Sequence, residues 1–177
     1  IFFHNPDVTV EEDSLQKMVD YLEKHPDVGI LGPKLMYSSG KVQESCRRHM
    51  SFFDLILNRT FLGRLPVFKK RVQKYLMKDF DHTKTQEVDL ITGAAIMMRR
   101  KIFDEIHGFD KRYFLFMEDF DLCRMVKKAG YKVVYYPDAF VNHYHKRLSQ
   151  GSTIKLLSKK VFWLHLSSAL KYFWKWR

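Results

Sequence analysis

The sequence predicts an α/β domain, in which short apolar strands alternate with amphipathic helices. Near the N-terminus, apolar residues recur at helical spacing. Further along, apolar runs are bounded by turn residues, and a helix that ends at Gly130 leads into an alternating strand. The chain has 177 residues, of which 46% are hydrophobic and 15% aromatic, so it fits a single domain with a substantial core.

The first half of the chain is predicted to contain four segments. They are a strand over residues 1–3, a helix over 11–24 with acids in its first turn, a buried strand over 28–35, and mixed helix and loop over 52–77. The second half is predicted to contain four more. They are a strand over 88–98, a short helix over 99–106, a helix over 119–128, and a strand over 131–136 that Pro137 closes.

Small residues interrupt the strand predicted over 88–98. Thr92, Gly93, Ala94 and Ala95 stand in succession within an otherwise apolar run. Small side chains inside a strand let a ligand or another backbone come close, and tight strand packing explains them equally well.

Three carboxylates, Glu118, Asp119 and Asp121, lie within four positions directly after an aromatic run. Low dielectric and a neighbouring like charge both raise the pKa of a carboxyl group, so such acids can take a proton or hold a cation. The alternative is helix capping, because acids favour a helix N-terminus. Three acids beside aromatic residues favour a functional site over capping alone.

Two polar segments follow predicted strands. Asn5-Pro6-Asp7 lies where a strand ends, which is the usual place for ligands in open α/β sheets. An acid there can hold Mg²⁺ or Mn²⁺, although the same tripeptide also forms ordinary turns. His143 and His145 could supply a nitrogen ligand, or they could be structural.

The net charge of +11 is concentrated toward the C-terminus, because no acid follows Asp138. This pattern suggests an anionic partner such as a membrane surface, a nucleic acid or a phosphorylated substrate. Residues 154–176 are apolar on most sides and carry Trp163, Trp174 and Trp176 among lysines. Such a helix either lies at a bilayer interface or packs on the domain.

Composition and motifs exclude several classes. No apolar run reaches the ~20 residues of a spanning helix, and no secretory leader is visible. Cys46 and Cys123 lack metal spacing, which favours a reducing, cytoplasmic setting. No nucleic-acid motif is present, so we expect no nucleic-acid partner. The chain opens in mid-strand without Met, and we expect it to be a fragment of a longer protein.

The ordered motifs resemble a known family. They are His4-Asn5-Pro6-Asp7, residues 25–33, residues 43–48, Tyr75-Leu76-Met77, residues 92–95, Gly108-Phe109-Asp110, residues 116–124 with Ala129-Gly130, and the His143 region. Together they resemble the C-terminal two-thirds of a family 2 glycosyltransferase of the GT-A fold, in its bacterial rhamnosyltransferase-like branch. The resemblance implies a partial GT-A domain with a mixed sheet, without the N-terminal nucleotide-binding portion. Residues 1–150 would form the metal and acceptor side, and residues 151–177 the basic, Trp-rich C-terminal helix.

The resemblance also implies an inverting transfer of a sugar, with rhamnose the expected one, from a nucleotide diphosphate-sugar to a hydroxyl of a lipid-linked saccharide. Asp119 resembles the catalytic base, with Glu118 beside it. Asp7 would hold Mg²⁺ or Mn²⁺ with His143, and Asn5 departs from the two-acid form of that motif. Gly93 and Ala94 would line the sugar or acceptor pocket.

The setting implied is the cytoplasm, with the protein peripheral at the inner face of the cytoplasmic membrane, in cell-surface polysaccharide synthesis. Two alternatives belong to other classes. The first is a non-catalytic membrane-surface binding module derived from such an enzyme. The second is a metal-dependent phosphoesterase that uses Asp7, Glu118 and Asp119 as ligands.

Overall fold

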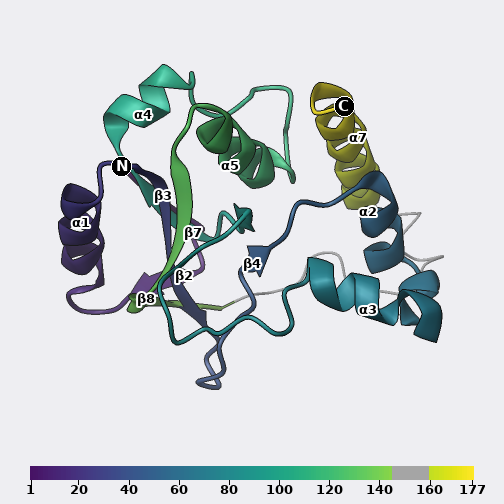
Figure 1. Ribbon diagram of the computed structural model, residues 1–177, viewed down its shortest axis with the longest axis horizontal. Helices are drawn as coiled ribbons and strands as arrows, with labels where there is room; N and C mark the ends of the chain where they lie inside the picture. Colours follow the sequence, from purple (N-terminus) through teal and green to yellow (C-terminus); the bar gives the residue numbers. More distant parts are fainter. Residues whose placement is uncertain (145–159) are drawn as a thin grey trace.

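The computed structural model describes residues 1–144 and 160–177, and a mixed sheet forms its centre (Figure 1). The strand order is β1-β7-β3-β8-β2, and β5 pairs with the first part of β8. The strands are β1 Phe2–His4, β2 Val8–Val10, β3 Val28–Met36, β5 Gln86–Glu87, β7 Ala95–Met98 and β8 Lys132–His143. The pair β3–β8 is parallel and the other pairs are antiparallel. A small second sheet joins β4 Cys46–Arg47 to β6 Leu90–Ile91.

Helices cover both faces of the central sheet. The helix α1, Ser14–Lys24, lies on one face, and α5, Glu118–Lys128, lies on the other with the short α4, Arg100–Glu105 (Figure 1). Side chains alternate between the faces along each strand. Accordingly, Val133 packs in the cluster with α5, and its neighbour Val134 packs in the cluster with α1.

A separate group of helices lies beside the sheet. It comprises α2 Phe52–Arg59, the 3₁₀ turn η1 Phe61–Arg64, α3 Pro66–Tyr75 and α7 Lys160–Lys175. Ser51 and Asp54 form a reciprocal capping box at the start of α2. The buried residues Leu55, Tyr75 and Tyr172 share one hydrophobic cluster, which joins α2, α3 and α7. These helices therefore pack on one another and against the loop that precedes α5.

The α/β fold class is confirmed, and three predicted elements differ from the structure. The strand expected over 88–98 forms two strands in different sheets, since β6 pairs with β4 whereas β7 pairs with β1 and β3. The strand expected to stop at Pro137 continues as β8 to His143. Its pairing with β3 jumps from Pro33–Tyr136 to Lys34–Phe140, so a bulge takes up the intervening residues and the ladder then resumes. The first helix begins at Ser14 rather than residue 11 and has no acid in its first turn. Asp13 precedes it in the left-handed region, with φ 61°, which breaks the helical path there.

Candidate active site

Asp119 lies against the small-residue segment between β6 and β7. Its Oδ2 accepts a hydrogen bond from the Gly93 backbone N–H at 2.8 Å, and its Oδ1 accepts from the Phe120 N–H at 2.9 Å. A Cβ added to Gly93 would lie 2.9 Å from the Asp119 Cβ, closer than side chains tolerate. The absence of a side chain at residue 93 thus permits the Asp119 side chain to pack against the backbone there.

An unusual backbone places these acids at the start of α5. Phe116 and Met117 adopt successive left-handed conformations, with φ 66° and 70°. Large side chains rarely adopt this region, which costs of order 1–3 kcal/mol per residue and clusters at functional sites. The two residues redirect the chain so that Glu118 begins the helix. No glycine occupies this turn, so the left-handed conformations could not be predicted from the residue types.

Glu118 carries a strongly perturbed carboxyl group. Its Oε2 is buried and has no hydrogen-bond partner among residues 1–144 and 160–177. Burial, followed by the neighbouring charge of Asp119, raises the pKa of Glu118 to about 7. Near neutral pH the Glu118 carboxyl group is therefore present in both its protonated and its ionised form.

Burial also raises the pKa of Asp119, while the N–H groups of Gly93 and Phe120 act in the opposite direction. Net desolvation of a carboxylate makes it a stronger base than an ordinary surface aspartate. Each carboxylate oxygen has a second lone pair beyond the hydrogen bond described above. Asp119 can therefore accept a further proton donor without losing its anchors.

Asp7 and His143 form a second polar pair. The antiparallel pairing of β2 with β8 places Val8 opposite His143, and the Tyr144 N–H donates to the Asp7 carbonyl at 2.9 Å. The His143 Nε2 consequently lies 3.4 Å from the Asp7 Oδ1. The His143 side chain is buried, whereas that of Asp7 is 42% exposed, so the pair opens to solvent on the aspartate side.

Gln43 contacts the far side of the same imidazole. Its Oε1 lies 2.9 Å from the His143 Nδ1, and its Nε2 donates to the His143 carbonyl at 2.8 Å. Gln43 and His143 are 100 residues apart in the chain, and β3 and β8 bring their neighbourhoods together. Sequence reasoning did not single out Gln43 as a site residue.

Backbone hydrogen bonding links the two halves of the site. The Asn5 N–H donates to the Ala94 carbonyl at 2.9 Å, and Ala94 adjoins the Gly93 that binds Asp119. Asn5 stands two positions before Asp7 and is exposed. Ala94 is buried among apolar residues at the ends of β3 and β8, with 7% of its surface exposed. The predicted site residues therefore form two pairs, Gly93 with Asp119 and Asp7 with His143, and the backbone hydrogen bond between residues 5 and 94 connects them.

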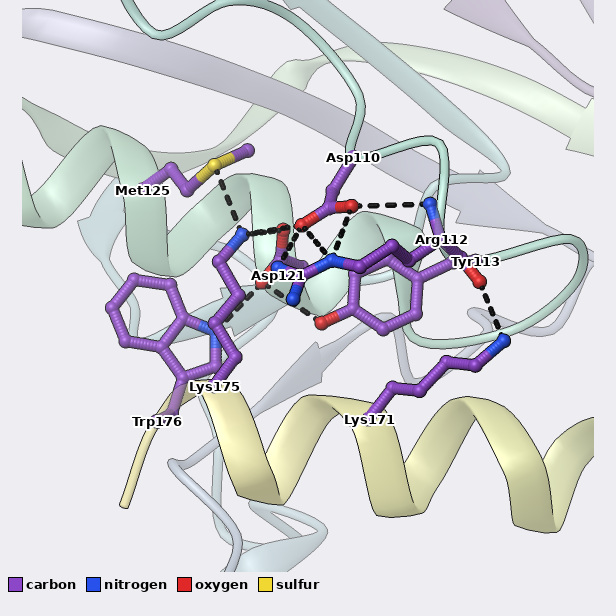
Figure 2. Close-up of polar contacts among 8 residues, drawn as sticks. All are labelled: Asp110, Arg112, Tyr113, Asp121, Met125, Lys171, Lys175 and Trp176. Atoms are coloured by element: carbon purple, nitrogen blue, oxygen red, sulfur yellow. Dashed lines mark hydrogen bonds and ion pairs between the residues drawn. The ribbon is translucent and has the colours of Figure 1, made fainter.

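Asp121 has a different role from the two acids before it. Figure 2 shows its fully buried carboxylate between α5 and α7, where it accepts from Trp176 Nε1 at 2.6 Å and from Lys175 Nζ at 2.7 Å. The Tyr113 hydroxyl donates at 3.3 Å, and Lys175 also reaches Asp110 at 2.9 Å. Asp121 thus anchors the C-terminal helix to the helix that carries Glu118 and Asp119.

The basic C-terminal segment is partly internal. Besides Lys175, Lys171 donates to the Arg112 carbonyl at 2.9 Å (Figure 2), and the Arg177 guanidinium lies over the Trp174 ring at 3.6 Å. Three large apolar side chains of α7 are exposed, namely Trp163, Leu170 and Trp174. His145, a possible ligand in the sequence analysis, and residues 154–159 of the predicted C-terminal helix lie outside the described residues.

Asp7 and His143 offer one oxygen and one nitrogen donor to a divalent metal ion. Within residues 1–144 and 160–177 no group of three or more His, Cys, Asp or Glu side chains is arranged to hold a metal ion. Two ligands suffice for Mg²⁺ or Mn²⁺ where substrate phosphates and water complete the shell. Neighbouring ligands in octahedral geometry lie roughly 3 Å apart, which is close to the 3.4 Å between Nε2 and Oδ1. The residues fit such an ion.

Comparison with known proteins identifies the family. The family described as "Glycosyltransferase like family 2" matches residues 1–161. The chain therefore belongs to glycosyltransferase family 2, as the resemblance implied, and its relatives include rhamnosyltransferases.

Two relatives are informative. The N-acetylglucosaminyl-diphospho-decaprenol L-rhamnosyltransferase of Mycobacterium tuberculosis is 33% identical over 147 residues, covering 83% of this chain and 47% of that protein. The rhamnosyltransferase WbbL of Escherichia coli K12 is 26% identical over 179 residues, covering 97% of this chain and 60% of that protein. The chain thus spans about half the length of these curated relatives.

A solved structure supports the fold. The crystal structure of GalNAc-T7 with UDP, GalNAc and Mn²⁺ superposes with a TM-score of 0.58 at 15% identity, over 97% of this chain and 30% of that one. This likeness confirms the GT-A-like arrangement of a mixed sheet flanked by helices. None of the helices in the described part combines the length and apolar character that crossing a bilayer requires.

Proposed function

We propose that this chain forms the metal- and acceptor-side portion of an inverting glycosyltransferase, which moves a sugar from a nucleotide diphosphate donor to a hydroxyl of a lipid-linked saccharide. The hydrogen bond from Gly93 to Asp119 is the observation that carries this proposal. It holds a desolvated carboxylate against the segment between β6 and β7. The backbone hydrogen bond from Asn5 to Ala94 connects that segment to the turn that contains Asp7.

Asp119 acts as the general base. A free lone pair on its carboxylate takes the proton of the acceptor hydroxyl as that oxygen forms a bond to the anomeric carbon. The bond from the anomeric carbon to the diphosphate breaks on the opposite side, which inverts the configuration. The raised pKa of Asp119 brings its basicity closer to working pH, where general-base catalysis contributes typically ~10²–10⁴-fold.

Glu118 keeps the local field around Asp119 negative when ionised and loses that charge near its pKa of about 7. Gly93 and Ala94 form the wall of the acceptor site, and Asn5 faces the donor diphosphate. Asp7 and His143 hold Mg²⁺ or Mn²⁺ when it is bound. That ion supplies positive charge against the developing charge of the leaving diphosphate.

Residues 1–150 constitute the catalytic portion, and α7 in residues 151–177 braces it through Asp121. The sugar is rhamnose, because both rhamnosyltransferase relatives carry that name. The acceptor is a saccharide on a lipid diphosphate, as in the name of the mycobacterial relative. The setting is the cytoplasmic face of the membrane, where such a lipid is reached from a nucleotide-sugar pool.

The membrane-facing surface is the segment formed by η1 and α3, which we call the α3 patch and define as Phe61, Arg64, Val67, Lys69 and Lys70. Phe61 and Val67 are 68% and 76% exposed. Residues 52–77 contain a single acid, Asp54, and it is bonded to Arg71. Apolar side chains among exposed cationic ones suit an anionic bilayer interface, whereas Lys171 and Lys175 of the C-terminal helix bond within the protein.

Metal-dependent donor binding tests the proposed site. Calorimetric titration of the full-length protein with UDP, dTDP and GDP, with and without Mn²⁺, is expected to give metal-dependent binding to one nucleotide. Asp7→Ala should abolish the metal dependence, and Asp20→Ala, an exposed acid of α1, should leave it unchanged. Equal binding by the protein and its Asp7→Ala variant would rule out Asp7 as a ligand.

Vesicle binding tests the α3 patch. Each basic residue near an anionic surface is worth about 1 kcal/mol, so a Lys69→Glu/Lys70→Glu double variant should bind phosphatidylserine vesicles at least about tenfold more weakly. The control is Leu15→Glu, at an exposed apolar position on α1. Unchanged vesicle binding by the double variant would exclude this surface.

A further inference from the structure

The structure assigns Gln43 as a positioning residue, which fixes the tautomer of His143 so that its Nε2 lone pair is available to a divalent cation shared with Asp7. This inference rests on the proposed metal site and gives a role to Gln43, which the sequence analysis included in the motif of residues 43–48 without assigning it one. It follows from two backbone carbonyls that can only accept hydrogen bonds, which fix the orientation of the Gln43 amide and thereby the tautomer of the His143 ring.

The orientation of the Gln43 amide is set by backbone carbonyls. Its Nε2 lies 2.8 Å from the His143 carbonyl oxygen and 3.4 Å from the Met36 carbonyl oxygen. Carbonyl oxygens only accept hydrogen bonds, so the NH₂ group of the amide must face them. A flipped amide would place three oxygens together in a buried position, where an unmet acceptor is costly. The amide oxygen therefore faces the imidazole.

The orientation of the Gln43 amide determines which nitrogen of the His143 ring is protonated. The Gln43 Oε1 lies 2.9 Å from the His143 Nδ1, and an amide oxygen can only accept. The Nδ1 must then carry the proton. In a neutral imidazole one nitrogen donates and the other accepts, so the Nε2 presents a lone pair. The side chain is 5% exposed, which leaves the ring little room to turn and reverse this assignment.

The result is two electron-rich atoms that face each other across 3.4 Å, the His143 Nε2 and the Asp7 Oδ1. A divalent cation bound by both atoms would offset the repulsion between their lone pairs. Metal-bound histidines typically donate their other ring N–H to an oxygen acceptor, which fixes the tautomer and the ring orientation. Gln43 supplies that acceptor, and its own NH₂ group is held by β3 and β8.

The tautomer can be read without metal. Long-range proton–nitrogen correlation NMR on the ¹⁵N-histidine-labelled full-length protein, at about pH 8, reports which ring nitrogen is protonated. The His143 signal is assigned by its loss in His143→Ala. We expect the Nδ1–H form. A protonated Nε2 in the neutral ring would overturn the inference, whatever the variants do.

Metal affinity gives the second readout. Electron paramagnetic resonance of free Mn²⁺, in the presence of dTDP, should show binding weakened about 10–100-fold in Gln43→Leu, which is the usual cost of losing such a partner. Gln16→Leu, an exposed glutamine on α1, should bind Mn²⁺ as the wild type does. Wild-type affinity in Gln43→Leu would overturn the inference.

The two proposals fail in different ways. If Asp7→Ala weakens Mn²⁺ binding and Gln43→Leu does not, the metal site stands and the role of Gln43 is wrong. If Asp7→Ala binds Mn²⁺ as the wild type does, the proposed metal site itself is wrong, and the inference falls with it. If Gln43→Leu fails to fold, the tautomer of the wild-type protein still decides the claim.

Discussion

The C-terminal helix offers a sharp test of whether its lysines serve the fold or an external partner. Lys175 and Lys171 lie one helical turn apart on α7, so each can be replaced by Met with the same loss of charge and a similar loss of length. Lys175 bonds the fully buried Asp121 at 2.7 Å and is itself 19% exposed. Lys171 is exposed and bonds only a backbone carbonyl among the contacts described above.

The expected magnitudes differ. Removing one partner of a buried ion pair costs about 3–5 kcal/mol, because the other charge is left uncompensated. The lower end, about 3 kcal/mol, applies to Lys175→Met since Trp176 and Tyr113 still donate to Asp121. Lys171→Met loses one exposed hydrogen bond, which is worth about 1 kcal/mol or less. The difference of about 2 kcal/mol corresponds to roughly 30-fold in the unfolding equilibrium.

Equilibrium unfolding in urea, followed by far-UV circular dichroism, measures the free energy of unfolding for both variants. A shift of the midpoint without a change of slope reports stability alone. Equal losses in the two variants would refute the reasoning. So would a Lys175→Met variant that keeps full stability but loses binding to anionic vesicles, because Lys175 would then face the membrane rather than Asp121.

Two further predictions concern the acids of α5. Glu118 has a folded pKa of about 7 against an ordinary 4.5, so the folded state binds the extra proton, and stability falls as pH rises through that window by on the order of 3 kcal/mol. The free energy of unfolding of Glu118→Gln should therefore exceed that of the wild type above about pH 7 and equal it near pH 4. Urea unfolding at both pH values measures this difference. A difference that does not change with pH would contradict the prediction. Gly93→Ala should displace Asp119, because the added Cβ meets the Asp119 Cβ at 2.9 Å, and lower kcat more than it raises KM. Wild-type kcat in that variant would show that the close approach is unimportant.

The sequence patterns predicted those helices and strands that depend on interactions between residues near one another in the chain. The helical spacing of Met18 and Leu22 and the buried runs of β3 and β7 express periodicity and turn chemistry, which are properties of neighbouring residues. The end of β8 was misplaced because Pro137 normally closes a strand, whereas here a bulge absorbs it. A bulge depends on the partner strand, and the sequence of one strand does not reveal it.

In the candidate site, too, some residues could be predicted from their sequence neighbours and others depend on distant partners. Glu118 and Asp119 stood out through composition, and Gly93 through its small neighbours. Their grouping with Asp121 was too coarse, because the partners of Asp121 lie about fifty residues further on, in Lys175 and Trp176. Gln43 stands in the motif of residues 43–48, but its role could not be predicted, since its contact with His143 spans 100 residues and depends on the pairing of β3 with β8.

The central claim is that Asp119 is the base, and one kinetic comparison tests it most directly. Sugar transfer from dTDP-rhamnose to N-acetylglucosaminyl-diphospho-decaprenol would be measured for the full-length protein and its Asp119→Asn variant, with donor affinity measured alongside. The asparagine keeps an oxygen for the Gly93 N–H but cannot take a proton. We expect transfer to fall by about 10²–10⁴-fold while donor affinity is largely retained. A variant that transfers the sugar at the wild-type rate would contradict the assignment of Asp119 as the base.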